Sequence, residues 1–469
     1  QRMAVLTFYG AAQEVTGSCY LLESPAIGRV LLDCGVRQGG DAIERVQEEG
    51  FLFDPTTIDA VILSHAHLDH SGMLPMLVNQ GFRGPIYCTQ ATKGLLRILL
   101  EDASGLYHRD IEHENLRRAR SGRPALEAEY SEKDVDAVIK QCSTAPYGSN
   151  VAITPQANLV FHDAGHILGS AIVELTLEEK GKTSRLVFSG DLGKTDSVLM
   201  NDPVELESAD LLLMEGTYGD RNHRTIDNTV EQLEQILHET WERGGNVLIP
   251  AFAVGRSQEI IYHLGCLYKN GLLDDWQVFL DSPMAIEVTQ VYDRWLNIMD
   301  DKDIKCLNDS GRESLAEFLP TLKLCNSSEE SMAINKIKQG AIIIAGSGMC
   351  TGGRIRHHFK HRIWHDNNTL LFIGFQARGT LGRRIVDGEK KIRLFGDEFV
   401  VRARVETLGG FSAHAGQSEL IAWAKNFDPA PRLMLVHGEA QALETLSQTL
   451  WTEHHIRSEI PVLGQSVAF

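Results

Sequence analysis

The chain has 469 residues, of which 43% are hydrophobic and 23% are charged. These fractions are ordinary for folded globular proteins and exclude global disorder, and the length suits two domains or one domain with a large insertion. The formal net charge of -18 at pH 7 argues against a general nucleic-acid binder, because such proteins are usually basic. Any binding of nucleic acid must therefore come from local basic patches.

The eight cysteines are scattered and form no CxxC pair, which argues against a zinc ribbon or a disulfide framework. Free thiols suit a reducing compartment, so we expect a cytoplasmic protein. The first residues lack the basic and apolar segments of a signal peptide. Apolar runs such as residues 341–345 are far shorter than the roughly 20 residues that a membrane span needs, so we expect no membrane contact.

Short strands that end in polar loops are predicted for the first half of the chain. Residues 30–33, 60–65 and 185–191 are apolar runs that pass directly into polar side chains. Residues 94–140 instead have a helical and charged pattern, which indicates an insertion whose function the pattern does not reveal. This recurring pattern of a strand followed by a polar loop is typical of a scaffold that carries its functional side chains on loops.

Strands and helices alternate from about residue 211, which indicates βαβ units. A helix is predicted over 229–243, a strand over 246–251 and a helix over 257–267. After about residue 399 the pattern of short strands ending in polar loops returns, and a predicted strand over 433–436 is followed directly by His437. Because the sequence has no internal repeat or low-complexity tract, we predict a discontinuous scaffold domain, residues 1–210 and 399–469, with an inserted α/β domain over 211–398.

One loop carries four potential metal ligands. His65, His67, Asp69 and His70 follow one another directly after a predicted strand. Neutral imidazole and carboxylate groups are the usual ligands of zinc, and this spacing lets one loop face two neighbouring metal sites. The alternative is a polar loop with incidental histidines.

A pair of metal ions needs more ligands than one loop offers. His166, Asp191 and His437 also lie beside the ends of predicted strands, where the active sites of layered α/β proteins gather. Each alone could be an ordinary loop residue. The predicted ligands form two sets and a bridge: His65, His67 and His166 for the first metal, Asp69, His70 and His437 for the second, and Asp191 between them. A water shared by two cations about 3.5 to 4 Å apart is deprotonated near neutral pH and can attack a phosphoryl group.

Three further polar residues suggest catalytic roles. A phosphodiester leaving group must gain a proton, and a histidine held by a carboxylate can deliver it. We interpret His414 as this general acid and Glu215, at the end of another predicted strand, as its partner; a satisfied histidine and a helix-capping glutamate are the alternative. Asp33 is placed to orient a ligand histidine, or it is a plain turn residue.

Basic residues cluster in two stretches of the second half: Arg354, Arg356, Lys360 and Arg362, then Arg378, Arg383, Arg384, Lys390, Lys391 and Arg393. Each stretch alone is as readily a solvated face. The glycine-rich run 346–354 follows a predicted strand and could bind phosphate through backbone amides. Residues that could contact a substrate phosphate, with a structural role as the alternative for each, are Ser347, Gly348, Arg354, Arg256, Arg378 and Ser412.

With these residues laid out, the chain resembles the β-CASP branch of the metallo-β-lactamase superfamily over nearly its whole length. Asp33 is similar to the first motif of that superfamily, residues 65–70 to the second, His166 to the third and Asp191 to the fourth. The resemblance implies an α/β fold, a four-layer αββα sandwich with an inserted α/β cap domain. It also implies two Zn2+ ions, with RNA entering between the sandwich and the cap.

Glu215, His414 and His437 are similar to the three further motifs of the β-CASP branch, and residues 250–258 and 346–354 resemble parts of its cap. RNA-processing members have a histidine at the last of these motifs, where DNA-repair members tend to have an apolar residue. His437 therefore favours RNA over DNA as the substrate, and the resemblance implies single-stranded RNA. The nearest resemblance is to prokaryotic stand-alone proteins similar to the endonuclease subunit of the cleavage and polyadenylation specificity factor.

The resemblance implies a zinc-dependent endoribonuclease that leaves 5′-phosphate and 3′-hydroxyl ends, with a 5′-to-3′ exoribonuclease as the alternative. A small-molecule ester or thioester hydrolase on the same scaffold would need neither the cap nor the Glu215 and His414 pair. Redox di-iron proteins on this scaffold have the pattern His-x-Glu-x-Asp at the second motif. In this chain His67 occupies the position of the glutamate, which favours the zinc hydrolase. A catalytically inactive subunit would be expected to lack some of the metal ligands, whereas none of the predicted ligands is missing from this chain. The preferred RNA, the pathway and the oligomeric state, a homodimer included, stay open.

Overall fold

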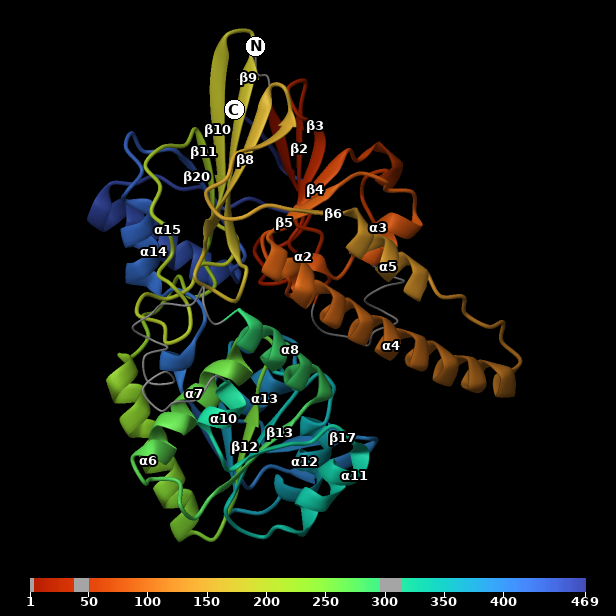
Figure 1. Ribbon diagram of the computed structural model, residues 1–469, viewed down its shortest axis with the longest axis vertical. Coiled ribbons are helices and arrows are strands. Elements are labelled where there is room, and N and C mark those ends of the chain that lie inside the picture. Colours follow the sequence, from red (N-terminus) through yellow and green to blue (C-terminus); the bar gives the residue numbers. More distant parts are fainter. Residues whose placement is uncertain (1–3, 38–49, 296–313) are drawn as a thin grey trace. The chain divides into compact units, whose positions relative to one another are not determined.

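The computed structural model describes residues 4–37, 50–295 and 314–469 (Figure 1). The chain divides into two compact units. Unit 1 comprises Gln1–Thr195, Asn201–Asn222 and His414–Phe469, and unit 2 comprises Asp196–Met200 and His223–Ala413. The described cysteines are free thiols, as predicted, whereas Cys306 lies outside the described residues. Within the described ranges, no helix is long and apolar enough to cross a lipid bilayer.

Two β-sheets form the centre of unit 1. In spatial order the first sheet contains β21 (Ser466–Ala468), β1 (Val5–Phe8), β2 (Tyr20–Ser24), β3 (Gly28–Leu32), β4 (Ala60–Ile62), β5 (Ile86–Cys88) and β6 (Cys142–Thr144). The second sheet contains β20 (Arg432–Val436), β11 (Leu211–Glu215), β10 (Lys182–Phe188), β9 (Ala171–Glu179), β8 (Ala157–Asp163) and β7 (Val151–Thr154).

Alternation along the strands divides the apolar side chains of unit 1 between two faces of each sheet. Leu32 and Leu213 belong to a core cluster that draws residues from both sheets. Leu31 faces the other way and packs with helices α3 (Leu74–Asn79), α4 (Gln90–Ser121) and α5 (Glu132–Gln141). On the second sheet, Leu212 packs with α14 (Gln417–Ala424) and α15 (Ala440–His454). The predicted four-layer αββα arrangement is confirmed, because helices cover the outer face of each sheet.

A parallel six-stranded sheet forms the centre of unit 2, as expected for the predicted βαβ units. Its spatial order is β14 (Leu322–Leu324), β13 (Gln277–Asp281), β15 (Ala341–Ala345), β12 (Val247–Pro250), β16 (Thr369–Phe372) and β19 (Arg404–Thr407). Among its described residues, the helices of this unit are α6 (Ile226–Glu242), α7 (Arg256–Lys269), α8 (Pro283–Arg294), α10 (Leu315–Phe318), α11 (Ser328–Ala333), α12 (Ile355–Arg362) and α13 (Leu381–Val386). A hairpin of β17 (Lys391–Leu394) and β18 (Asp397–Val400) packs beside α12 (Figure 1).

Strand pairing divides the chain later than the predicted boundaries at 210/211 and 398/399. Strand β11 lies between β10 and β20, so it belongs to the second sheet of unit 1. Strand β19 pairs with β16 and therefore belongs to unit 2. The buried apolar β11 has the pattern of a parallel strand in either unit, and the largely polar β19 lacks a strand-like apolar pattern, so the sequence could not assign either segment.

Candidate metal centre

Strand β4 and the short helix α2 (Leu68–Ser71) position the four loop residues predicted as ligands. His65 follows β4 and is fully buried. His67 immediately precedes α2, while Asp69 lies in its first turn and His70 in its last. One turn of chain therefore presents three imidazoles and a carboxylate.

Backbone contacts hold this loop against the end of β3. Cys34 N–H donates to the carbonyl of His70 at 2.8 Å, and Ser18 N–H donates to the carbonyl of Asp69 at 2.9 Å. A Cβ atom at Gly35 would lie 1.7 Å from the Asp69 carbonyl oxygen, so this close approach requires glycine. The loop is fixed by main-chain contacts as well as by its side chains.

Asp191 lies at the centre of the cluster and is buried. Its Oδ2 is 3.2 Å from His70 Nε2 and 3.5 Å from both His65 Nε2 and His166 Nε2. Its Oδ1 is 3.5 Å from His437 Nδ1. Four imidazoles from three segments of unit 1 thus face one carboxylate, as a bridging ligand would require.

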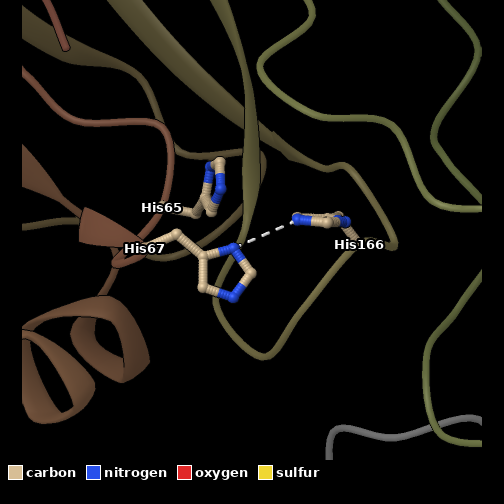
Figure 2. Close-up of side chains that lie close together, drawn as sticks. All are labelled: His65, His67 and His166. Atoms are coloured by element: carbon tan, nitrogen blue, oxygen red, sulfur yellow. Dashed lines mark hydrogen bonds between the residues drawn. The ribbon is translucent and has the colours of Figure 1, made fainter. Parts of the chain in front are cut away.

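The remaining distances divide the residues into the two predicted sets. His65, His67 and His166 gather on one side, where His67 Nδ1 is 3.3 Å from His166 Nε2 (Figure 2). On the other side His437 Nε2 is 3.1 Å from His70 Nε2 and 3.2 Å from Asp69 Oδ2. The potential ligand atoms of each set lie within 4.8 Å of one another.

Unsatisfied buried atoms show that this donor set fits a cation. Among the described residues, His65 Nε2 and Asp191 Oδ1 are buried and have no hydrogen-bond partner. A buried polar atom without a partner is destabilising unless something else binds it. Nitrogen and carboxylate donors that converge in this way are the ligands that zinc takes in proteins.

The electrostatics of the site also favour a cation. Burial would raise the pKa of Asp191, but the imidazoles of His437 and His70 hold that pKa well below its usual range. Burial would lower the pKa of His70, but the surrounding carboxylates, Asp191 first, raise it well above its usual value. Burial lowers the pKa of His65 and keeps its imidazole neutral, which is the form that binds metals.

Hydrogen bonds from outside the ligand sets orient three of the imidazoles. Asp33 Oδ2 lies 2.6 Å from His70 Nδ1, so this residue contacts a potential ligand in the way the sequence suggested. Ser64 Oγ lies 3.0 Å from His65 Nδ1, and Thr217 Oγ1 lies 3.0 Å from His437 Nδ1. Sequence reasoning missed both hydroxyls, because a serine or threonine in a loop carries no signal of its own.

Glu215 and His414 form a pair beside the cluster. Glu215 is buried, and its Oε1 is 3.0 Å from His414 Nδ1 and accepts a 2.7 Å hydrogen bond from Leu192 N–H. His414 Nε2 is 4.0 Å from Asp191 Oδ2, and the ring of His414 is 4.7 Å from that of His166. The position allows His414 to act as an acid, and it also allows a role as a ligand with His166 and Asp191.

The residues predicted to contact phosphate all lie in unit 2. Arg354 donates to Asp281 Oδ1 at 2.7 Å, and Arg256 pairs with Glu259 at 3.0 Å. Ser347 Oγ donates to the carbonyl of Gly352 at 3.1 Å. Gly348 and Ser412 are buried, and Arg378 is exposed. The two arginines thus have carboxylate partners within unit 2, and phosphate contact stays a prediction for this group.

Three family models match the chain in succession. Residues 28–241 match the Beta-lactamase superfamily domain, residues 257–385 match the Beta-Casp domain, and residues 398–461 match the Zn-dependent metallo-hydrolase RNA specificity domain. A solved structure of a protein of unknown function from Enterococcus faecalis V583 is similar in fold, with a TM-score of 0.51, 13% identity and full coverage of both chains.

Curated relatives match at higher identity. Ribonuclease TTHA0252 of Thermus thermophilus is 41% identical over 444 residues, which cover 94% of this chain and 95% of that protein. Transcription termination factor FttA of Methanothermobacter thermautotrophicus is 33% identical, with 99% of this chain and 71% of that protein covered. An RNase J-like protein of Methanocaldococcus jannaschii is 31% identical, with 98% and 99% covered.

Proposed function

Because the chain belongs to the β-CASP family of the metallo-β-lactamase superfamily, we propose that it is a zinc-dependent endoribonuclease that leaves 5′-phosphate and 3′-hydroxyl ends. The matched metallo-hydrolase domains support the coarser assignment, a hydrolase with a divalent-metal site. RNA as substrate is supported by the 41% identity to ribonuclease TTHA0252 and by His437, and we propose that this RNA is single-stranded. The observation that carries the proposal is the convergence of four imidazoles on Asp191.

The donor atoms would hold two Zn2+ ions. The first would be held by His65, His67 and His166, and the second by Asp69, His70 and His437, with Asp191 between them. When bound, zinc lowers the pKa of water to near neutrality and offsets negative charge on a phosphoryl group. Asp33, Ser64 and Thr217 hold the rings of these ligands in place, which metal sites generally require.

The protein's own acid is His414 in this proposal. Glu215 accepts the Nδ1 hydrogen of His414, which leaves Nε2 as the nitrogen that carries the transferable proton. The departing 3′-oxygen of the RNA takes this proton as its bond to phosphorus breaks. The His414 side chain is 15% exposed, so solvent can restore its proton afterwards.

A circular single-stranded RNA tests the proposal. We expect the zinc-loaded protein to cut the circle as well as the same RNA made linear with a 5′-monophosphate. The variant Asp191→Ala should cut neither, whereas the exposed His238→Ala variant should behave like the wild type. Degradation of the linear RNA alone would make the protein a 5′-to-3′ exoribonuclease, and inertness toward both RNAs would contradict a ribonuclease.

A further inference from the structure

One face of α12 carries basic and aromatic side chains together. His357, Lys360, His361 and Trp364 are exposed and follow the i, i+3, i+4, i+7 spacing that places residues on one side of a helix. Trp364 follows the end of α12, and its Nε1 donates to the Lys360 carbonyl at 3.0 Å. The stripe is therefore a continuous part of the surface of unit 2.

Phe395, at the turn of the β17–β18 hairpin, extends this stripe. Its ring stacks on His357 with centroids 4.6 Å apart, and the cationic groups of Arg356 and Lys360 lie 5.3 and 5.9 Å from its centre. Ile392 and Leu394 of the hairpin pack in the same core as Ile355 and Phe359 of α12, which fixes the turn against the helix. Phe395 nevertheless remains 47% exposed.

The charge of this region contrasts with that of the whole protein. The formal net charge is -18, yet Arg356, His357 and Lys360 surround one exposed ring. Burial lowers the pKa of His357, and the neighbouring cations lower it further. Several other basic residues of the two sequence stretches have acidic partners, such as Arg354 with Asp281 at 2.7 Å and Arg384 with Glu389 at 2.6 Å.

We propose that the α12 surface, defined as Arg356, His357, Lys360, Trp364 and Phe395, binds single-stranded RNA. Bases would stack on the exposed rings of Phe395 and Trp364, while Arg356 and Lys360 pair with backbone phosphates. The choice of a polyanion with aromatic rings follows from complementarity, because the surface offers cations and exposed rings together. The inference rests on the proposed function for its ligand class, and it adds a binding surface built by unit 2 alone.

A second exposed ring provides a matched control. Trp451 of α15 is also 47% exposed and has Arg457 at 5.3 Å from its centre. Glu444 and Glu459 line the same groove, so this ring has acidic neighbours. If an exposed ring were sufficient for binding, Trp451 and Phe395 would bind RNA equally well. Because cations surround the Phe395 ring whereas glutamates lie beside Trp451, we expect RNA to bind at the α12 surface and not at Trp451.

The test measures binding of the full-length, zinc-loaded protein to a fluorescein-labelled single-stranded 2′-O-methyl RNA by anisotropy, with the RNA checked for integrity afterwards. Phe395→Ala should weaken binding about tenfold, because the substitution removes a ring on which a base stacks, and Phe395→Trp should restore binding. The double variant R356Q/K360Q should flatten the slope of log K against log salt by about 1.4, at about 0.7 per phosphate contact. Trp451→Ala should bind within about twofold of the wild type.

The outcomes separate this inference from the proposed function. Unchanged binding by Phe395→Ala, or an equal loss in Trp451→Ala, would overturn the inference. Weaker binding by R356Q/K360Q alone, with polyglutamate displacing the RNA, would indicate a site for an acidic protein and would also overturn it. A wild type that binds through Phe395 but cuts no RNA contradicts only the ribonuclease assignment.

Discussion

Replacement of His414 by alanine distinguishes an acid from a metal ligand. As an acid, His414 protonates the departing 3′-oxygen, and loss of such a group slows a reaction by about 10²- to 10⁴-fold. Because its side chain is partly exposed and the Ala415 N–H keeps its 2.9 Å bond to the Leu192 carbonyl, we expect the fold to persist. The zinc content should also be unchanged.

A substrate with a good leaving group makes the assay specific. Para-nitrophenolate departs near neutral pH without being protonated, so an acid contributes little to its release. We expect His414→Ala to cut a labelled RNA at least about 100-fold more slowly, but to hydrolyse bis-para-nitrophenyl phosphate within about tenfold of the wild type.

Replacement of Glu215, the carboxylate that holds His414, should slow RNA cleavage less than replacement of His414 itself. In Glu215→Gln the hydrogen bond from His414 Nδ1 loses its charged acceptor, and such bonds contribute about 1.5–3 kcal/mol. RNA cleavage should therefore fall by about 10- to 100-fold. Equal losses of rate on RNA and on bis-para-nitrophenyl phosphate, or a loss of zinc from His414→Ala, would refute the role of His414 as the general acid. Either result would instead make His414 a metal ligand beside His166 and Asp191.

Three other predictions concern the metal site and the stability of unit 2. Asp191→Ala should abolish RNA cleavage and leave fewer than two zinc ions per chain by elemental analysis, whereas His238→Ala keeps both. Thr217→Val removes the hydroxyl that holds His437 and should weaken zinc affinity about 10- to 100-fold in a chelator competition. Asp281→Asn should destabilise unit 2 by about 3 kcal/mol in urea at pH 7, because the buried carboxylate that pairs with the Arg354 guanidinium becomes neutral. Burial would raise the pKa of Asp281, but its hydrogen bonds lower this pKa below the usual value. The stabilisation by the Asp281 carboxylate is therefore present above the unfolded pKa and is lost as pH falls through the folded pKa. A difference in unfolding free energy between wild type and Asp281→Asn that grows toward acid pH would contradict this.

Spacing in the sequence was sufficient to predict the metal loop. His65, His67, Asp69 and His70 are close in sequence, and one strand end and one helical turn suffice to bring them together. The same local reasoning predicted the two kinds of domain, since alternation and helical periodicity depend only on neighbouring residues. His437 was predicted by its place at a strand end, although its partners lie far away in the chain.

Strand order and register decided what spacing could not. Parallel pairing of β11 with β20 joins segments about two hundred residues apart, and this pairing assigns residues 211–215 to unit 1. The same long-range packing brings Thr217 to His437, gives Arg354 a carboxylate partner in Asp281, and places Phe395 against the cations of α12. Local sequence determines which face a side chain takes on its own element, but only the packing of distant elements determines what that face meets.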